Sequence, residues 1–87
     1  MKAFGSIGSE HELRAFLAVL FTDREIEHAG SRWKALQTSL RGLSQRDVAE
    51  RLGVGIGTAS HAAKILKIAR HRATVERIVA RTKKNKN

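Results

Sequence analysis

The fold of this chain is decided between Ser44 and Leu66, by the stretch SQRDVAERLGVGIGTASHAAKIL. Ser44 is a favourable N-cap residue, and Asp47 places a carboxylate in the following first turn, where the helix dipole favours it. Gly53 stands where that helix must stop, because glycine takes a left-handed conformation without steric cost. A second helix is expected to begin near Gly55 and to run through ASHAAKILK. The stretch therefore predicts two short helices joined by a tight turn.

Small side chains allow the two helices of this predicted hairpin to cross closely. Ala49 lies in the middle of the first helix, and Ala59 and Ala62 lie on the facing side of the second. The apolar Val54 directly after the turn is expected to be buried beneath it. Such a hairpin on a basic chain is typical of a DNA-binding helix-turn-helix. The alternative is a purely structural hairpin, and Ala59 favours it, since a larger valine or isoleucine is usual at that position.

The composition indicates one small domain with a small core. The chain has 87 residues, no proline, no cysteine, three phenylalanines and one tryptophan. Disulfides and thiolate metal sites are thereby excluded. A chain this short buries a modest fraction of its surface, which favours dimerisation as a source of extra core. No apolar run approaches the ~18 residues of a membrane span, and the start MKAFGSIGSE lacks the apolar region of a signal peptide. We therefore expect a soluble cytoplasmic protein.

The net charge of +9 is concentrated in the last quarter of the chain. Residues 64–87 contain nine Lys or Arg and one acid, Glu76, whereas residues 1–63 contain eight Lys or Arg and seven acids. Phosphates are the obvious counter-charge for such a basic segment. An anionic membrane surface is less favoured, because the last predicted helix has few large apolar residues and no aromatic anchor.

Two capping signals predict the helices that precede the hairpin. Ser9 followed by Glu12 has the pattern of a capping box, and it opens the helix EHELRAFLAVLF. Thr22 followed by Glu25 is a second such pattern, and it opens a helix that runs to about residue 41. Gly30 inside that helix costs about 1 kcal/mol relative to alanine. It is therefore expected to permit the close approach of another backbone.

The remaining patterns complete an all-α domain of five short helices. A last helix is expected at about 70–81, with apolar residues at helical spacing, and no strand pattern occurs. We expect a flexible N-terminus at residues 1–8 and a single helical DNA-binding domain at 9–81. The helix-turn-helix lies within it at about 45–67, and a basic disordered tail follows at 82–87.

Enzymatic and metal chemistry are not indicated. The cluster GVGIG is not a dinucleotide-binding pattern and follows a helix rather than a strand. No two of the four histidines form an H-x-x-x-H pair, so no metal site is expected. No serine or acid has the neighbours of a catalytic constellation. The chain is expected not to be an enzyme.

The sequence between about residues 20 and 67 resembles the Trp repressor family. The similarity is carried by TDREIEHAGSR at 22–32, the pair Arg41-Gly42, SQRDVAERLGVGI at 44–56, and Lys67. The resemblance implies an all-α, intertwined homodimer in which helices outside the hairpin form a shared core. It also implies operator binding, with two hairpins entering successive major grooves about 34 Å apart.

The resemblance also implies a set of DNA-binding positions. An exposed apolar residue at the start of a recognition helix, as at Ile56, can contact a thymine methyl group. A glycine such as Gly57 lets the backbone come close to DNA. The expected contacts to phosphates or base edges are Gln45, Arg46 and Thr58; those facing the groove are Ile56, Gly57 and Ser60; those to phosphates are Lys64 and Lys67.

The positions that would hold a tryptophan corepressor match the family less well. Arg32 corresponds to one of the two arginines that hold the indole, whereas the other is replaced by the shorter His61. Ala62 replaces a glycine, and Ile65 replaces a serine that meets the amino group of the ligand. Thr22 is retained, although it is equally explained as an N-cap. Because an apolar chain beside an ammonium costs free energy, the sequence predicts that L-tryptophan binding is weak or absent.

The leading prediction is a sequence-specific DNA-binding regulator, a repressor that binds a palindromic operator as a homodimer. One alternative is a nucleoid or architectural protein that binds DNA without sequence choice. Another is a protein-interaction module that uses the hairpin as a docking surface. RNA binding is disfavoured, because a single tryptophan provides no platform for stacking bases.

Overall fold

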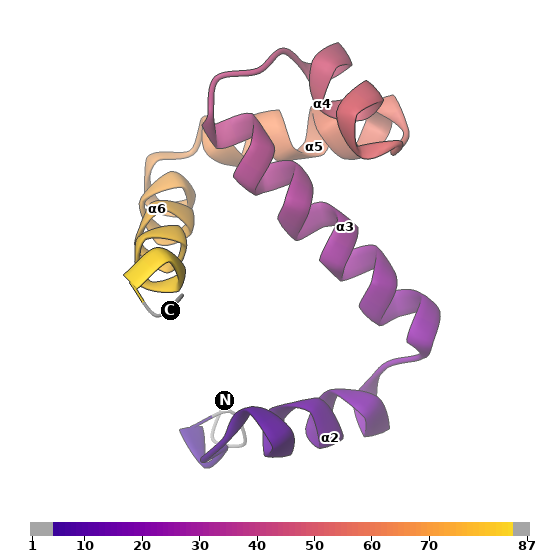
Figure 1. Ribbon diagram of the computed structural model, residues 1–87, viewed down its shortest axis with the longest axis vertical. Coiled ribbons are helices and arrows are strands. Elements are labelled where there is room, and N and C mark those ends of the chain that lie inside the picture. The colour runs from indigo at the N-terminus through magenta and orange to yellow at the C-terminus, as the bar shows by residue number, and fades with distance from the viewer. Residues whose placement is uncertain (1–4, 85–87) are drawn as a thin grey trace.

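The helices of this chain are laid out in Figure 1, a computed structural model that describes residues 5–84. They are α2 (Glu10–Leu20), α3 (Asp23–Leu40), α4 (Gln45–Leu52), α5 (Ile56–Leu66) and α6 (Ala69–Lys84). No residue in the described range is in a strand, so the expected all-α architecture of five helices is confirmed. None of these helices is long and apolar enough to cross a bilayer.

The caps that were expected around α3 and α4 are formed. The Ser44 side chain accepts a hydrogen bond from the backbone N–H of Asp47 at 3.1 Å. Gly53 ends α4 in the left-handed conformation, with φ 67° and ψ 31°. At the start of α3, Thr22 and Glu25 form both bonds of a capping box. Local capping chemistry therefore sets where these helices begin and end.

Two expectations at the ends of the chain are corrected. Ser9 caps α2, but the Glu12 carboxylate accepts from the backbone N–H of Gly8 at 3.0 Å rather than from that of Ser9. At the other end, α6 continues to Lys84, so residues 82–84 are helical and not part of a disordered tail. Residues 1–4 and 85–87 lie outside the described part, so the flexibility expected there stays a prediction.

The core lies where the hairpin packs on the C-terminal half of α3. Ala35 of α3, Val48 of α4, and Ala59 and Ala62 of α5 are at most 1% exposed. Three of these four residues are alanines, so the helices approach closely, as expected for Ala59 and Ala62. In Figure 1 α6 leaves the end of α5 and lies beside this unit, where its Val75 is also buried. One chain therefore has a core of small side chains.

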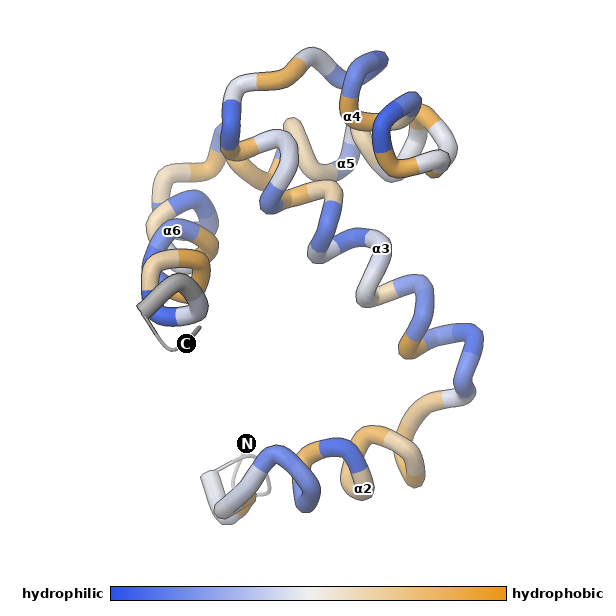
Figure 2. The backbone as a smooth tube through the Cα atoms, in the orientation of Figure 1, coloured by the Kyte–Doolittle hydropathy of each residue, from blue (hydrophilic) through white to orange (hydrophobic). Residues whose placement is uncertain are grey.

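The N-terminal arm, which we define as α2 and the first half of α3 (residues 10–31), has no such core. No residue of α2 is buried, and α2 does not pack extensively on any other described helix. Figures 1 and 2 show the arm extending away from the hairpin, with apolar residues along α2. A methyl group added at Gly30 would meet no neighbouring atom within 4 Å, so the close approach expected there does not occur within one chain. The exposed large apolar side chains of the arm are Val19, Leu20, Phe21 and Ile26.

Candidate nucleic-acid interface

The hairpin holds the start of α4 against the first turns of α5. The Ser60 hydroxyl donates a hydrogen bond to Gln45 Oε1 at 2.7 Å. These two residues were both expected to contact DNA, and the structure joins them across the two helices. Arg46 follows Gln45 and is exposed. The start of α4 and the outer side of α5 therefore form one continuous surface.

The outer side of α5 is the surface opposite to its buried residues. Ala59, Ala62 and Leu66 face the core, and Ile56, Gly57 and Lys64 are exposed. Ile56 is 57% exposed, which is unfavourable for an isoleucine in water. Gly55, the N-cap of α5, provides no side-chain cap. The Thr58 N–H donates to the Gly55 carbonyl at 3.1 Å, so the N–H groups of Ile56 and Gly57 are the ones left for solvent or for an anion. Of the other expected DNA contacts, Thr58 and Ser60 are half-buried and Lys67 is exposed at the C-cap.

The positive charges around this surface are not neutralised by any ion pair in the described part of the chain. Among the described residues, the ion pairs are Arg14–Glu10 and Arg72–Glu76, each at 3.4 Å and each exposed. Arg46, Lys64 and Lys67 take part in neither pair. A surface with free cations and free N–H groups is suited to a phosphate backbone.

Sequence reasoning missed where His61 lies. It follows Gly57 by one helical turn and precedes Lys64 by one, so the three share a face of α5. His61 is exposed, and it therefore lies on the surface that carries the expected DNA contacts. The four- and three-residue steps between these positions were the signal that could have shown it.

The residues expected to form an effector pocket are not brought together within one chain. Thr22 lies at the start of α3, about 15 Å along the helix from Arg32, and its hydroxyl is bonded to Glu25. His61 is exposed, and Ile65 is half-buried. Ala62 is 1% exposed and belongs to the core of the single chain, and its place in an effector pocket stays a prediction.

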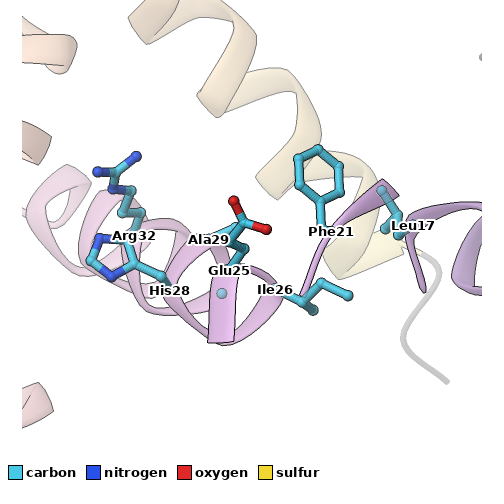
Figure 3. A pocket seen from close by; sticks show the side chains of 8 residues that line it. Leu17, Phe21, Glu25, Ile26, His28, Ala29 and Arg32 are labelled. Carbon is cyan, nitrogen blue, oxygen red and sulfur yellow. The ribbon is translucent and has the colours of Figure 1, made fainter. Parts of the chain in front are cut away.

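A separate cleft of about 520 Å³ lies between the end of α2 and the first half of α3. Figure 3 shows Phe21 and Leu17 at one end of it, and Arg32 and His28 at the other. It contains Arg32 but none of the other expected effector residues. Its lining residues are Leu17, Phe21, Glu25, Ile26, His28, Ala29, Gly30 and Arg32.

No group of three or more potential metal ligands occurs among the described residues. His61, the histidine on the hairpin surface, is therefore not part of such a group.

Comparison with known proteins gives one match. Residues 1–81 match the model of the Trp repressor protein family, which is nearly the whole chain and wider than the resemblance at residues 20–67. No curated protein and no solved structure matches the chain.

Proposed function

The chain belongs to the Trp repressor family, and from this premise we propose that it is a repressor that binds a palindromic operator as a homodimer. The family consists of helix-turn-helix DNA-binding regulators and not of enzymes. The observation that carries the proposal is the exposed start of α5. There Ile56 and Gly57 are exposed beside Gln45 and Ser60, which are joined by a hydrogen bond.

The proposed reading mechanism divides the work between two kinds of contact. Phosphate contacts from Arg46, Lys64 and Lys67 supply affinity that does not depend on sequence. Ile56 and Ser60 face base edges in the major groove, where a methyl group or a hydrogen-bonding pattern distinguishes one base pair from another. Bound at a promoter, the protein would repress by occluding it.

The proposed homodimer rests on the exposed apolar surface of the N-terminal arm. Val19, Leu20 and Phe21 are 80%, 54% and 45% exposed. An isolated helix of 11 residues is marginal in water, and α2 has little support from its own chain. A second copy of the arm would cover this surface and supply the shared core that a single chain lacks. Two hairpins would then be available for the two halves of a palindrome.

The dimer is tested by light scattering on matched variants. Ile26→Ser removes an exposed isoleucine of the arm, and Ile56→Ser removes one from the hairpin. We expect the first variant to shift the mass from two chains toward one, and the second to leave it unchanged. A wild-type protein with the mass of one chain at high concentration would overturn the homodimer.

We also propose that L-tryptophan is at most a weak effector. His61 is exposed, Ala62 is buried, and Ile65 presents an apolar side chain. Ala62 and Ile65 offer neither the charge nor the small polar group that an amino acid would need, and His61 is shorter than the arginine that it replaces. Isothermal titration with L-tryptophan should give no micromolar binding, and a micromolar dissociation constant would contradict this proposal.

The experiment that tests the function is selection of bound sequences from random duplex DNA, with and without tryptophan. We expect one palindromic sequence to be enriched, and the same one in both selections. Binding without enrichment would favour an architectural protein. No binding even at low salt would favour a protein-interaction module.

A further inference from the structure

Helix α6 carries a row of three arginines that the hairpin function does not use. Arg70, Arg77 and Arg81 follow one another at steps of seven and four, which places them on one face of the helix. All three are exposed. We call Arg70, Arg77 and Arg81 the arginine row.

No carboxylate neutralises the arginine row within the described chain. The only acid of α6 is Glu76, and its carboxylate is paired with Arg72 at 3.4 Å. Arg72 lies on a different face from the row, because it is five residues from Arg77 and two from Arg70. The row is therefore three free guanidinium groups on a helix that already contains one internally paired arginine.

The row points away from the rest of the molecule. Val75 is 5% exposed, and His71 and Val79 are half-buried. These residues form the side on which α6 packs against α3 and α5, and the arginines lie on the opposite side. Ile78 is 43% exposed, but it is a single large apolar side chain, which is too little for α6 to enter a lipid surface.

The row continues the charges of the hairpin. Only Lys67 and Ile68 separate α5 from α6, and Figure 1 shows α6 starting directly at the end of α5. Arg70 is thus three residues beyond Lys67, the last cation of the proposed DNA surface. From Arg70 to Arg81 the row extends for about 16 Å, a length over which one strand of duplex DNA presents roughly five phosphates.

We propose that the arginine row binds the phosphate backbone of the same DNA duplex, beside the groove that α5 enters. The inference rests on the proposed function in that it assumes binding to duplex DNA. It does not require sequence choice, because phosphate contacts are independent of sequence. Guanidinium groups suit this task, since their planar fork donates two hydrogen bonds to one phosphate. The basic last quarter of the chain would then lengthen the DNA footprint.

The size of the effect follows from counterion release. Affinity falls as salt rises, and each phosphate contact makes the slope of log affinity against log salt more negative by about 0.9. Between 50 and 200 mM salt one contact corresponds to a change in affinity of about 3.5-fold, or about 12-fold in a dimer that carries each change twice. Replacing an arginine of the row by glutamine should remove that much of the salt dependence.

The test compares Arg70→Gln, Arg77→Gln and Arg81→Gln with Arg72→Gln. All four variants lose one positive charge from α6, but Arg72 is outside the row and paired with Glu76. The slope is measured on the selected operator and on a duplex of unrelated sequence, with helix content checked by circular dichroism. We expect the row variants to reduce the magnitude of the negative slope on both duplexes, and Arg72→Gln to reduce it less.

Phosphate ethylation provides the second readout. Ethylated phosphates that block the wild-type protein should become harmless to the triple variant of the row. Equal slopes for the row variants and Arg72→Gln, or an unchanged ethylation pattern, would overturn the inference while leaving operator binding intact. If no operator is selected, the proposed function fails, and the slopes on the unrelated duplex still decide for or against the row.

Discussion

Replacing Gly53 by alanine should destabilise this chain, whereas the same replacement at Gly57 should stabilise it. Both changes add one methyl group within the same hairpin, and neither methyl would meet an atom within 4 Å. A clash of the added methyl group with neighbouring atoms is therefore expected in neither variant. What differs is the backbone, since Gly53 has φ 67° and Gly57 has no positive φ.

The magnitudes follow from that difference. A left-handed conformation costs a non-glycine residue about 1–2 kcal/mol. Alanine also lowers the conformational entropy of the unfolded chain, which stabilises the folded state by about 0.4–1 kcal/mol and offsets part of that cost. Gly53→Ala should therefore lower the free energy of unfolding by about 1 kcal/mol. Gly57 is in the first turn of α5, where alanine should raise it by up to about 1 kcal/mol. Gly53→Asn should cost less than Gly53→Ala, because asparagine tolerates the left-handed region.

The assay is urea or thermal unfolding followed by circular dichroism at several protein concentrations, so that association can be separated from folding. For a domain of this size, 1 kcal/mol corresponds to about 4–8 °C in Tm. The two alanine variants should differ in Tm by about that amount or more, with Gly53→Ala the lower. Equal Tm values, or a more stable Gly53→Ala, would refute a left-handed end of α4.

Three further predictions concern the hairpin. Ser44→Ala removes the bond to the Asp47 N–H and should lower the free energy of unfolding by about 1 kcal/mol, measured by urea unfolding; no change would mean that Ser44 does not cap α4. Val48→Ala truncates the largest fully buried side chain and should cost about 2 kcal/mol, and a loss below that of an exposed valine would contradict the position of the core. Ile56→Ala should change the free energy of unfolding by less than about 0.5 kcal/mol, but it should lower affinity for the operator and weaken discrimination at one base pair. A gel shift against single-base operator variants would detect this. If the variant discriminates among these operators as the wild type does, Ile56 is not part of the reading surface.

The parts of the fold that the sequence predicted are those controlled by neighbouring residues. Ser44, Thr22 and Gly53 act within four residues of themselves, so their types alone indicate where α3 and α4 begin and where α4 ends. Capping also explains the two expectations that were wrong, the capping box at Ser9 and the end of the last helix at residue 81. Glu12 can reach either of two adjacent N–H groups, and the structure selects that of Gly8. Nothing in residues 82–84 stops a helix, so α6 continues beyond Arg81.

The candidate site was predictable along each helix but not between helices. Helical spacing indicates that Ile56 and Gly57 are near one another on α5. It does not indicate that the start of α3, with Thr22, is remote from the end of α5, with Ile65. The effector residues were grouped through the resemblance to the family. That grouping requires residues of α3 and of α5 to lie close together, and helical spacing along one helix does not predict this. The burial of Ala62 has the same origin, because it depends on which helix covers α5.

The bond between Ser60 and Gln45 has a consequence for the chemical polarity of the reading surface. A glutamine amide has an accepting end and a donating end, and in solution either can face outward. The bond from the Ser60 hydroxyl holds the oxygen end of the amide toward α5, which leaves the NH₂ group as the end turned to an incoming strand. That end can serve a phosphate oxygen or an acceptor on a purine. Besides facing the groove itself, Ser60 would thus also act on DNA through its neighbour, because it determines which half of the Gln45 amide the duplex meets.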